Sequence, residues 1–191
     1  MLTIILTMPV RKLVYIEDEC LRQKAQAITQ LSPSLSQLVE DMVDTMRAHH
    51  GVGLAGPQIG EMKRIFVAHI PLPDSDEVEP IHPEAGKTFV LINPVVVSSS
   101  SARMEGEEGC LSIPGWRGLV ERPDSVTVEA LTLTGEKVSL QADGFLARVF
   151  LHEIDHLNGV LYVDHISDQT KLWQVPELDE VPLAAEVETS A

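Results

Sequence analysis

The sequence predicts an α+β fold in which mixed or antiparallel sheets pack around a C-terminal helix that contains the motif HExxH. Two segments, one near each end of the chain, have apolar residues at helical spacing, and β-branched apolar runs lie between them. This order of helix, several strands and helix is typical of the α+β class. At 191 residues the chain is long enough for one domain with a proper core.

The first predicted helix follows Ser32-Pro33-Ser34, which is a helix-start signal. Apolar residues then recur at helical spacing, with acids and amides between them: Leu35, Leu38, Val39, Met42, Val43 and Met46. We expect this helix to end near His49 and His50, just before Gly51. Because adjacent residues point to different faces, a role at the helix end suits these histidines better than metal binding.

The middle of the chain reads as strands and loops. Apolar or alternating runs predict strands at residues 64–70, 89–97, 125–133 and 137–141, the last two joined by a Thr134-Gly135 turn. Residues rich in Gly, Pro or polar groups predict loops at 51–60 and 71–86 and a turn at 98–101.

A second helix is predicted from Phe145 to Asn158, with Gly159 at the position expected of a helix C-terminus. No internal repeat or linker divides the chain. We therefore expect an apolar N-terminal segment at 1–9, a single catalytic domain at 10–170 and an acidic, flexible tail at 171–191.

Composition excludes several classes of protein. The 14 basic and 29 acidic residues give a formal charge of −15, which argues against non-specific binding to nucleic acid or an anionic membrane. The two cysteines, Cys20 and Cys110, are too few for a disulfide scaffold and favour a reducing compartment. No apolar run is long enough to span a membrane, and the basic residues follow the apolar start instead of preceding it, which argues against a signal peptide.

The predicted second helix carries His152-Glu153-Ile154-Asp155-His156. Residues four apart lie on one face of a helix, so His152 and His156 can bind one divalent metal. Glu153 can then reach a water held by that metal. We expect Phe150, Ile154 and Leu157 to anchor the opposite face in the core.

Two histidines require a third protein ligand, leaving a fourth position for water. The extended protease motif would supply a histidine where this chain has Tyr162, and it needs a methionine turn, but no Met follows Met104. His165 lies beyond the helix and could fold back. Cys110 could supply a thiolate, although a lone Cys is often just a small buried hydrophobe. The residues alone leave His165 and Cys110 open.

Three stretches resemble the motifs of the peptide deformylase family, in the same order and at similar spacing. They are GVGLAGPQIG at 51–60, EGCLS at 108–112 and HEIDHLNG at 152–159. Val10-Arg11-Lys12-Leu13 and Ile92-Asn93-Pro94 also resemble that family, and the likeness runs from about Val10 to about Ile166.

The resemblance implies a role for each matching residue. Cys110, His152 and His156 would be metal ligands, and Glu153 would be the general base and acid. The remaining implied positions concern the substrate: Gln58 and the Leu111 N–H would polarise its carbonyl, Val52 and Gly53 would line its groove, and Arg117 would lie at the edge.

The implied reaction is hydrolytic removal of the formyl group from the N-terminal formyl-methionine of new polypeptides. The family suggests Fe(II), with Zn(II) or Ni(II) as alternatives, and a cytoplasmic enzyme that works near ribosomes without recognising nucleic acid or membrane. Gly56 and Leu151 depart from the usual alanine and glutamine. We expect Gly56 to loosen the loop that aims Gln58, and Leu151 to remove a polar neighbour of the first ligand.

Two other functions fit part of these observations. An HExxH metallopeptidase would need a downstream His or Glu as its third ligand and would tolerate Cys110→Ser. A catalytically weak relative would bind metal and nascent N-termini without turnover.

Overall fold

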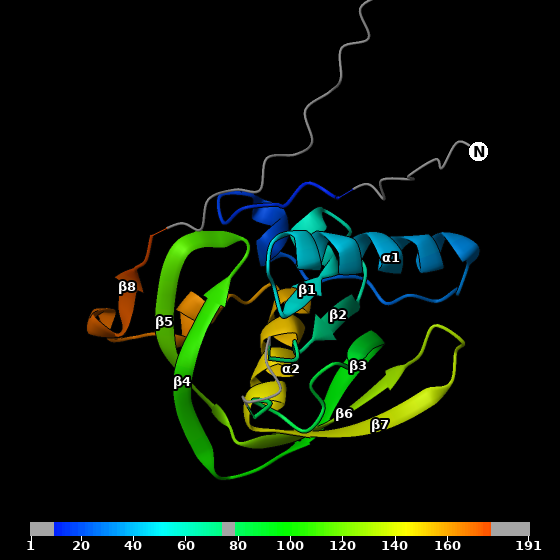
Figure 1. Ribbon diagram of the computed structural model, residues 1–191. Helices are drawn as coiled ribbons and strands as arrows, with labels where there is room; N and C mark the ends of the chain where they lie inside the picture. The colour runs from blue at the N-terminus through cyan, green and yellow to red at the C-terminus, as the bar shows by residue number, and fades with distance from the viewer. Residues whose placement is uncertain (1–9, 74–78, 177–191) are drawn as a thin grey trace, which may run out of the picture.

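The computed structural model describes residues 10–73 and 79–176, and the predicted segment 1–9 lies outside this part. The α+β prediction is confirmed (Figure 1). Two helices are combined with a five-stranded sheet of order β1-β2-β3-β6-β7 and a three-stranded sheet of order β4-β5-β8. Every pairing between these strands is antiparallel. No helix in the described ranges is long and apolar enough to cross a bilayer.

The elements have the following bounds. The helices are α1 at Pro33–Ala48 and α2 at Gly144–Leu157. The five-stranded sheet contains β1 at Gly53–Ala55, β2 at Ile65–His69, β3 at Thr88–Ser99, β6 at Ser125–Leu131 and β7 at Lys137–Asp143. The three-stranded sheet contains β4 at Arg103–Cys110, β5 at Ile113–Pro123 and β8 at Leu172–Gln174. Short 3-10 turns lie at Glu19–Arg22, Gly56–Ile59, Tyr162–His165 and Gln169–Lys171.

The two helices pack on opposite faces of the five-stranded sheet. In β2, Ile65 and Val67 pack with the apolar residues of α1, whereas Phe66 packs with those of α2. Successive side chains of a strand point to opposite faces, so a strand covered on both sides is apolar throughout. The ring of Phe66 lies 5.5 Å from that of Phe150, which anchors α2 as predicted.

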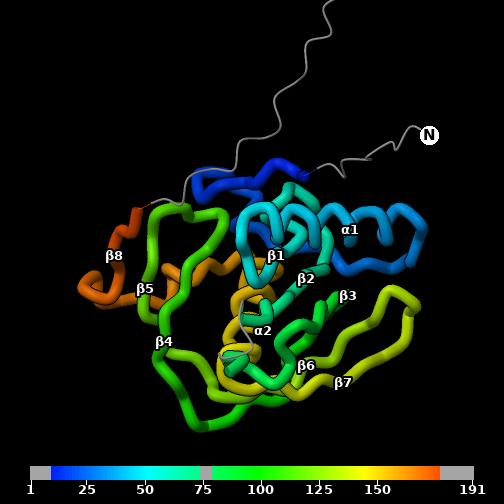
Figure 2. The backbone as a smooth tube through the Cα atoms, in the orientation of Figure 1, coloured from blue at the N-terminus to red at the C-terminus, as the bar shows by residue number. Residues whose placement is uncertain are grey.

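The second sheet approaches α2 from another side. Figure 2 shows the β4–β5 hairpin beside α2. This hairpin is absent from the sequence prediction, as are β1 and β8. The predicted polar turn at 98–101 was placed too early, because β3 continues through Ser99.

The predicted tail needs one correction at its start. Strand β8 at Leu172–Gln174 pairs with β5, so the folded part extends past residue 171. The remainder of the predicted tail, 177–191, lies outside the described residues. The predicted end of the second helix agrees with the structure. Gly159, which follows α2, has a φ of +76°, the left-handed conformation expected after a helix.

Candidate metal centre

Three of the predicted ligand residues come together from two elements. Cys110 ends β4, while His152 and His156 lie on one face of α2. One ligand atom from each of the three residues lies within 4.8 Å of the others, and Sγ of Cys110 is 3.2 Å from Nε2 of His156. One sulfur and two imidazole nitrogens form a donor set that suits borderline divalent metals. The arrangement therefore fits a metal ion and leaves a coordination position for water.

The electrostatics of Cys110 agree with a ligand role. Burial by itself would raise the pKa of its thiol. The positive charge of His156 and hydrogen bonds from both histidines outweigh this effect and hold the pKa well below its ordinary value. The thiolate, which is the form that binds metal, is thus favoured at this position.

Glu153 is buried beside the same centre and is 3% exposed. Burial raises the pKa of its carboxyl to about 7. Its Oε2 atom and Nδ1 of His156 have no hydrogen-bond partner among the described residues. Buried polar atoms are normally paired, so the unpartnered Oε2 of Glu153 is what a site for a bound group and its water would leave. Nδ1 of His156 is a different case, because Nε2 is the nitrogen of that ring that faces Cys110.

A contact from Glu108 orients His152. Nδ1 of His152 donates a hydrogen bond to Oε2 of Glu108 at 2.9 Å, which leaves Nε2 of His152 facing Cys110 and His156. Arg122 donates to both oxygens of Glu108, at 2.9 and 3.0 Å. Burial would raise the pKa of Glu108, but Arg122 and His152 lower it far below its usual range.

Sequence reasoning did not assign a role to Glu108. It is 5% exposed, whereas Glu107 is exposed, and only their alternation along β4 separates them. The contact also corrects the expectation for Leu151. Leu151 packs against the core, and the polar partner of His152 comes from β4 instead.

Gln58 is held firmly between two elements. Its Oε1 accepts a hydrogen bond from the Ala55 N–H at 2.7 Å, and its Nε2 lies 3.4 Å from Sγ of Cys110. Gly56, two residues earlier, is buried. A Cβ there would approach the carbonyl oxygens of Glu61 and Lys63 to 2.6 and 2.7 Å. The expectation of a loosened loop was wrong, because glycine permits this close packing.

The residues predicted to contact substrate lie next to residues of the centre, either in sequence or in space. Gly53 lies so close to Glu153 that a Cβ would fall 2.2 Å from Oε1. Val52 is half-buried and packs against the core beside α2. Leu111 directly follows Cys110, and Arg117 pairs with Gly109 across the β4–β5 hairpin. The structure therefore brings all of these predicted positions to one region.

His165, the other candidate for the third ligand, is engaged elsewhere. Its Nε2 lies 2.8 Å from Oδ2 of Asp155 and 3.3 Å from Nη1 of Arg122. The metallopeptidase alternative required a downstream ligand of this kind, and His165 does not join the cluster of Cys110 and the two histidines.

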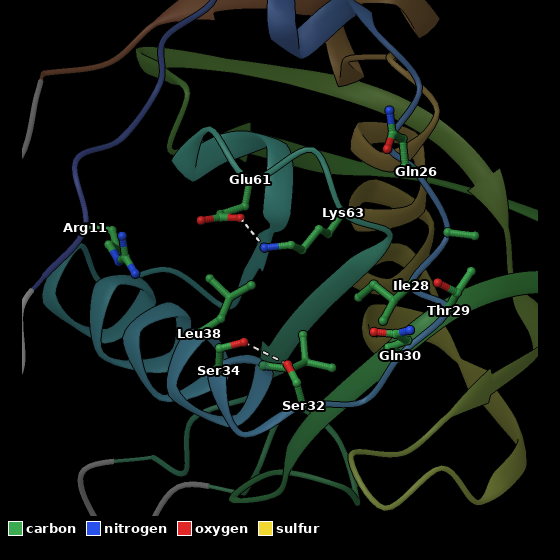
Figure 3. A pocket seen from close by; sticks show the side chains of 12 residues that line it. Arg11, Gln26, Ile28, Thr29, Gln30, Ser32, Ser34, Leu38, Glu61 and Lys63 are labelled. Carbon is green, nitrogen blue, oxygen red and sulfur yellow. Dashed lines mark hydrogen bonds and ion pairs between the residues drawn. The ribbon is translucent and has the colours of Figure 1, made fainter.

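A separate cavity lies away from this centre. It has a volume of about 400 Å³ and lies between α1, the chain at 26–32 and the turn at 61–63 (Figure 3). Its cations already have partners: Arg11 pairs with Asp41, and Lys63 pairs with Glu61. The thiolate, imidazoles and buried carboxylate instead converge at α2, where the site chemistry lies.

The fold and this centre define a metal-dependent hydrolase, and comparisons with known proteins identify its family. The family model of polypeptide deformylase matches residues 10–172. A peptide deformylase of Thermomicrobium roseum is 47% identical over 173 residues, which cover 91% of this chain and 95% of that protein. The chain belongs to the polypeptide deformylase family, whose members remove the N-formyl group from nascent peptides.

Solved structures agree with this assignment. A peptide deformylase of Acinetobacter baumannii with bound Met-Ala-Ser has a TM-score of 0.75 and 37% identity, covering 83% of this chain and 99% of that one. A peptide deformylase of Synechococcus elongatus in complex with actinonin has a TM-score of 0.76 and 38% identity, covering 85% of this chain and 82% of that one.

Proposed function

We propose that Cys110, His152 and His156 bind one divalent ion and that Glu153 moves the protons of deformylation at this site. The observation that carries the proposal is the buried cluster of one sulfur and two imidazoles beside the unpartnered carboxylate oxygen of Glu153. When bound, the ion supplies Lewis acidity, which lowers the pKa of water from 15.7 toward about 7 in favourable zinc sites.

Glu153 accepts the proton of the water that attacks the formyl carbon, and it then delivers that proton to the departing amine. A pKa near the working pH suits a group with both tasks, and burial raises that of Glu153 to about 7. The products are formate and a free amino terminus. The carboxylate of Glu153 packs directly against the backbone of Gly53, where a side chain would leave it no room.

Gln58 and the Leu111 N–H stabilise the charge that develops on the formyl oxygen. The Gln58 amide is held by Ala55, so its Nε2 is fixed near Cys110 before substrate arrives. One such prepositioned donor typically contributes about 3–4 kcal/mol to the transition state. Val52 and Gly53 line the substrate groove, and Arg117 provides a positive charge at its edge.

The substrate is the formyl-methionyl end of a nascent polypeptide. The Met-Ala-Ser bound to the Acinetobacter baumannii relative supports a peptide that begins with methionine. The enzyme acts in the cytoplasm close to the ribosome, where such ends emerge. A formal charge of −15 opposes direct binding to ribosomal RNA, so this proximity is transient.

Fe(II) is the proposed ion. A thiolate donates charge and weakens the Lewis acidity of the metal, which favours Fe(II) over Zn(II), and Ni(II) is an alternative with similar ligands. With iron the enzyme would be sensitive to oxygen in two ways, because both Fe(II) and the thiolate of Cys110 can be oxidised.

The test is an anaerobic assay with Fe(II) or Ni(II) and a short formyl-methionyl peptide, in which released formate is measured. Wild type should release formate, and Glu153→Ala should retain the metal but lose release. Metal binding without turnover in wild type would contradict the proposal and favour a weak, substrate-binding relative. Unchanged release in Glu153→Ala would assign the proton transfer to another group.

A further inference from the structure

Helix α2 contains a buried arginine, Arg148, that has no part in the chemistry proposed above. It lies four residues before His152, on the same side of the helix, and is 7% exposed. Buried guanidinium groups need acceptors, because an unpaired charge is strongly disfavoured away from water. The acceptors of Arg148 all belong to the β4–β5 hairpin.

Four hydrogen bonds join Arg148 to this hairpin. Its Nη1 donates to Oε1 of Glu108 at 2.9 Å and to the carbonyl oxygens of Val120 and Gly106 at 2.8 and 3.2 Å. Its Nη2 donates to the carbonyl oxygen of Met104 at 2.8 Å. The planar guanidinium thus contacts both strands of the hairpin, which an ammonium group could not do.

The hairpin is shaped to receive this side chain. A Cβ at Gly106 would lie 2.8 Å from Nη2 of Arg148 and 2.9 Å from its central carbon. Any larger residue at 106 would therefore displace the guanidinium. Gly106 and Arg148 fit one another across two elements that are far apart in sequence.

The geometry of the metal centre depends on how these two elements meet. Cys110 is on the hairpin, and both histidines are on α2. Arg122 is itself on β5, so its bonds to Glu108 stay within the hairpin, while its bond to Asp155 at 2.6 Å reaches α2 near the second histidine. Arg148 provides the corresponding link near the first histidine, directly to the strand that ends in Cys110.

We propose that Arg148 is a positioning residue for deformylation, which sets the separation of Cys110 from the two histidines through Glu108 and the β4 backbone. This inference rests on the ligand set given under Proposed function. It concerns the placement of the sulfur ligand and not the chemistry of any reacting atom.

The experiment loads the full chain with Co(II), because a cobalt–thiolate bond gives a charge-transfer absorption that reports on the sulfur directly. Arg148→Met should bind Co(II) about 10–100-fold more weakly by chelator competition, as is typical when a partner behind a ligand is lost. The charge-transfer band should weaken, and kcat should fall more than KM rises. Arg148→Lys keeps the positive charge but not the planar guanidinium with its two donor groups, so its Co(II) affinity and band intensity should lie between those of wild type and Arg148→Met.

Three further variants make the result specific. Gly106→Ala should displace the guanidinium of Arg148 from the hairpin side and so weaken Co(II) binding and the band in the same way. It serves as the test if Arg148→Met does not fold. Arg103→Met removes an exposed ion pair with Glu121 on the same hairpin and should leave metal binding unchanged. Val126→Ala lowers stability in the core between the five-stranded sheet and α2 and removes none of the hydrogen bonds of Arg148, so it should leave the cobalt band unchanged.

Two results would overturn the inference in different ways. If Arg148→Met and Gly106→Ala keep the wild-type band, Co(II) affinity and kcat, Arg148 is a structural residue alone. If the band is missing in wild type or persists in Cys110→Ser, the proposed ligand set fails and the inference fails with it.

Discussion

His152 and Glu108 are joined by a hydrogen bond of 2.9 Å between Nδ1 and Oε2, across two elements that the sequence separates by 44 positions. Glu108 fixes the ring of His152 so that Nδ1 carries the proton and Nε2 is free to bind a metal. Glu108 also forms buried ion pairs with Arg122 and Arg148, and these two positive charges compensate its negative charge.

Glu108→Gln should therefore weaken metal affinity by about 10–100-fold, because a neutral amide holds the imidazole less firmly. Chelator competition on the full chain measures this effect. Glu107→Gln is the matched control, since Glu107 is the exposed neighbour on the opposite side of β4. Equal affinities in the two variants would contradict the role given to Glu108.

Gly53→Ala should reduce kcat while the metal remains bound. The new methyl group would meet Oε1 of Glu153 at 2.2 Å, so the carboxylate must move away from its position. Steady-state kinetics and metal analysis on the same sample check both parts. Gly144→Ala is a useful comparison: its Cβ meets no atom within 4 Å, but its φ of +48° costs stability, so its effect should fall on unfolding and not on kcat.

Arg122→Ala should lower the free energy of unfolding by about 1.5–3 kcal/mol, because it removes charge-assisted hydrogen bonds to the buried carboxylate of Glu108 and to Asp155. Glu108 keeps Arg148, and Asp155 keeps His165. Denaturant unfolding of the metal-free chain gives the value. Arg103→Ala removes an exposed pair and should change stability by no more than about 1 kcal/mol. A similar small loss for both variants would mean that the buried network contributes little.

Cys20 should react slowly with iodoacetamide in the folded protein. Burial, assisted by Asp18, raises the pKa of its thiol to about 11, so at pH 8 only about 0.1% is thiolate. Cys110→Ser leaves Cys20 as the one remaining thiol of the chain. Alkylation of this variant should be about 100-fold faster after unfolding, and equal rates would contradict the raised pKa.

The helices and the apolar strands could be predicted from the sequence because their periods are strong. The apolar residues of α1 repeat at helical spacing, and the first four residues of β2, Ile65 to Ala68, are apolar and buried. The β4–β5 hairpin could not, because Glu105-Gly106-Glu107-Glu108-Gly109 lacks alternating apolar residues and includes two glycines. Its pairing depends on partners in β5 and on Arg148 in α2, which are contacts that local pattern does not contain.

The same distinction applies to the site. The spacing of His152 and His156 indicates a shared ligand face, whereas the third ligand could be chosen only through the family resemblance. No sequence pattern marked the two residues that support the ligands, Glu108 and Arg148. Glu108 resembles Glu107 in sequence, and Arg148 resembles any charged residue of an amphipathic helix until the tertiary structure buries it.

The most direct test of the metal centre is X-ray absorption spectroscopy of the metal-loaded full chain. With Zn(II), the account predicts one sulfur neighbour at about 2.3 Å and nitrogen or oxygen neighbours at about 2.0–2.1 Å, with the sulfur lost in Cys110→Ser. A first shell in the wild type that contains only nitrogen and oxygen would contradict the account.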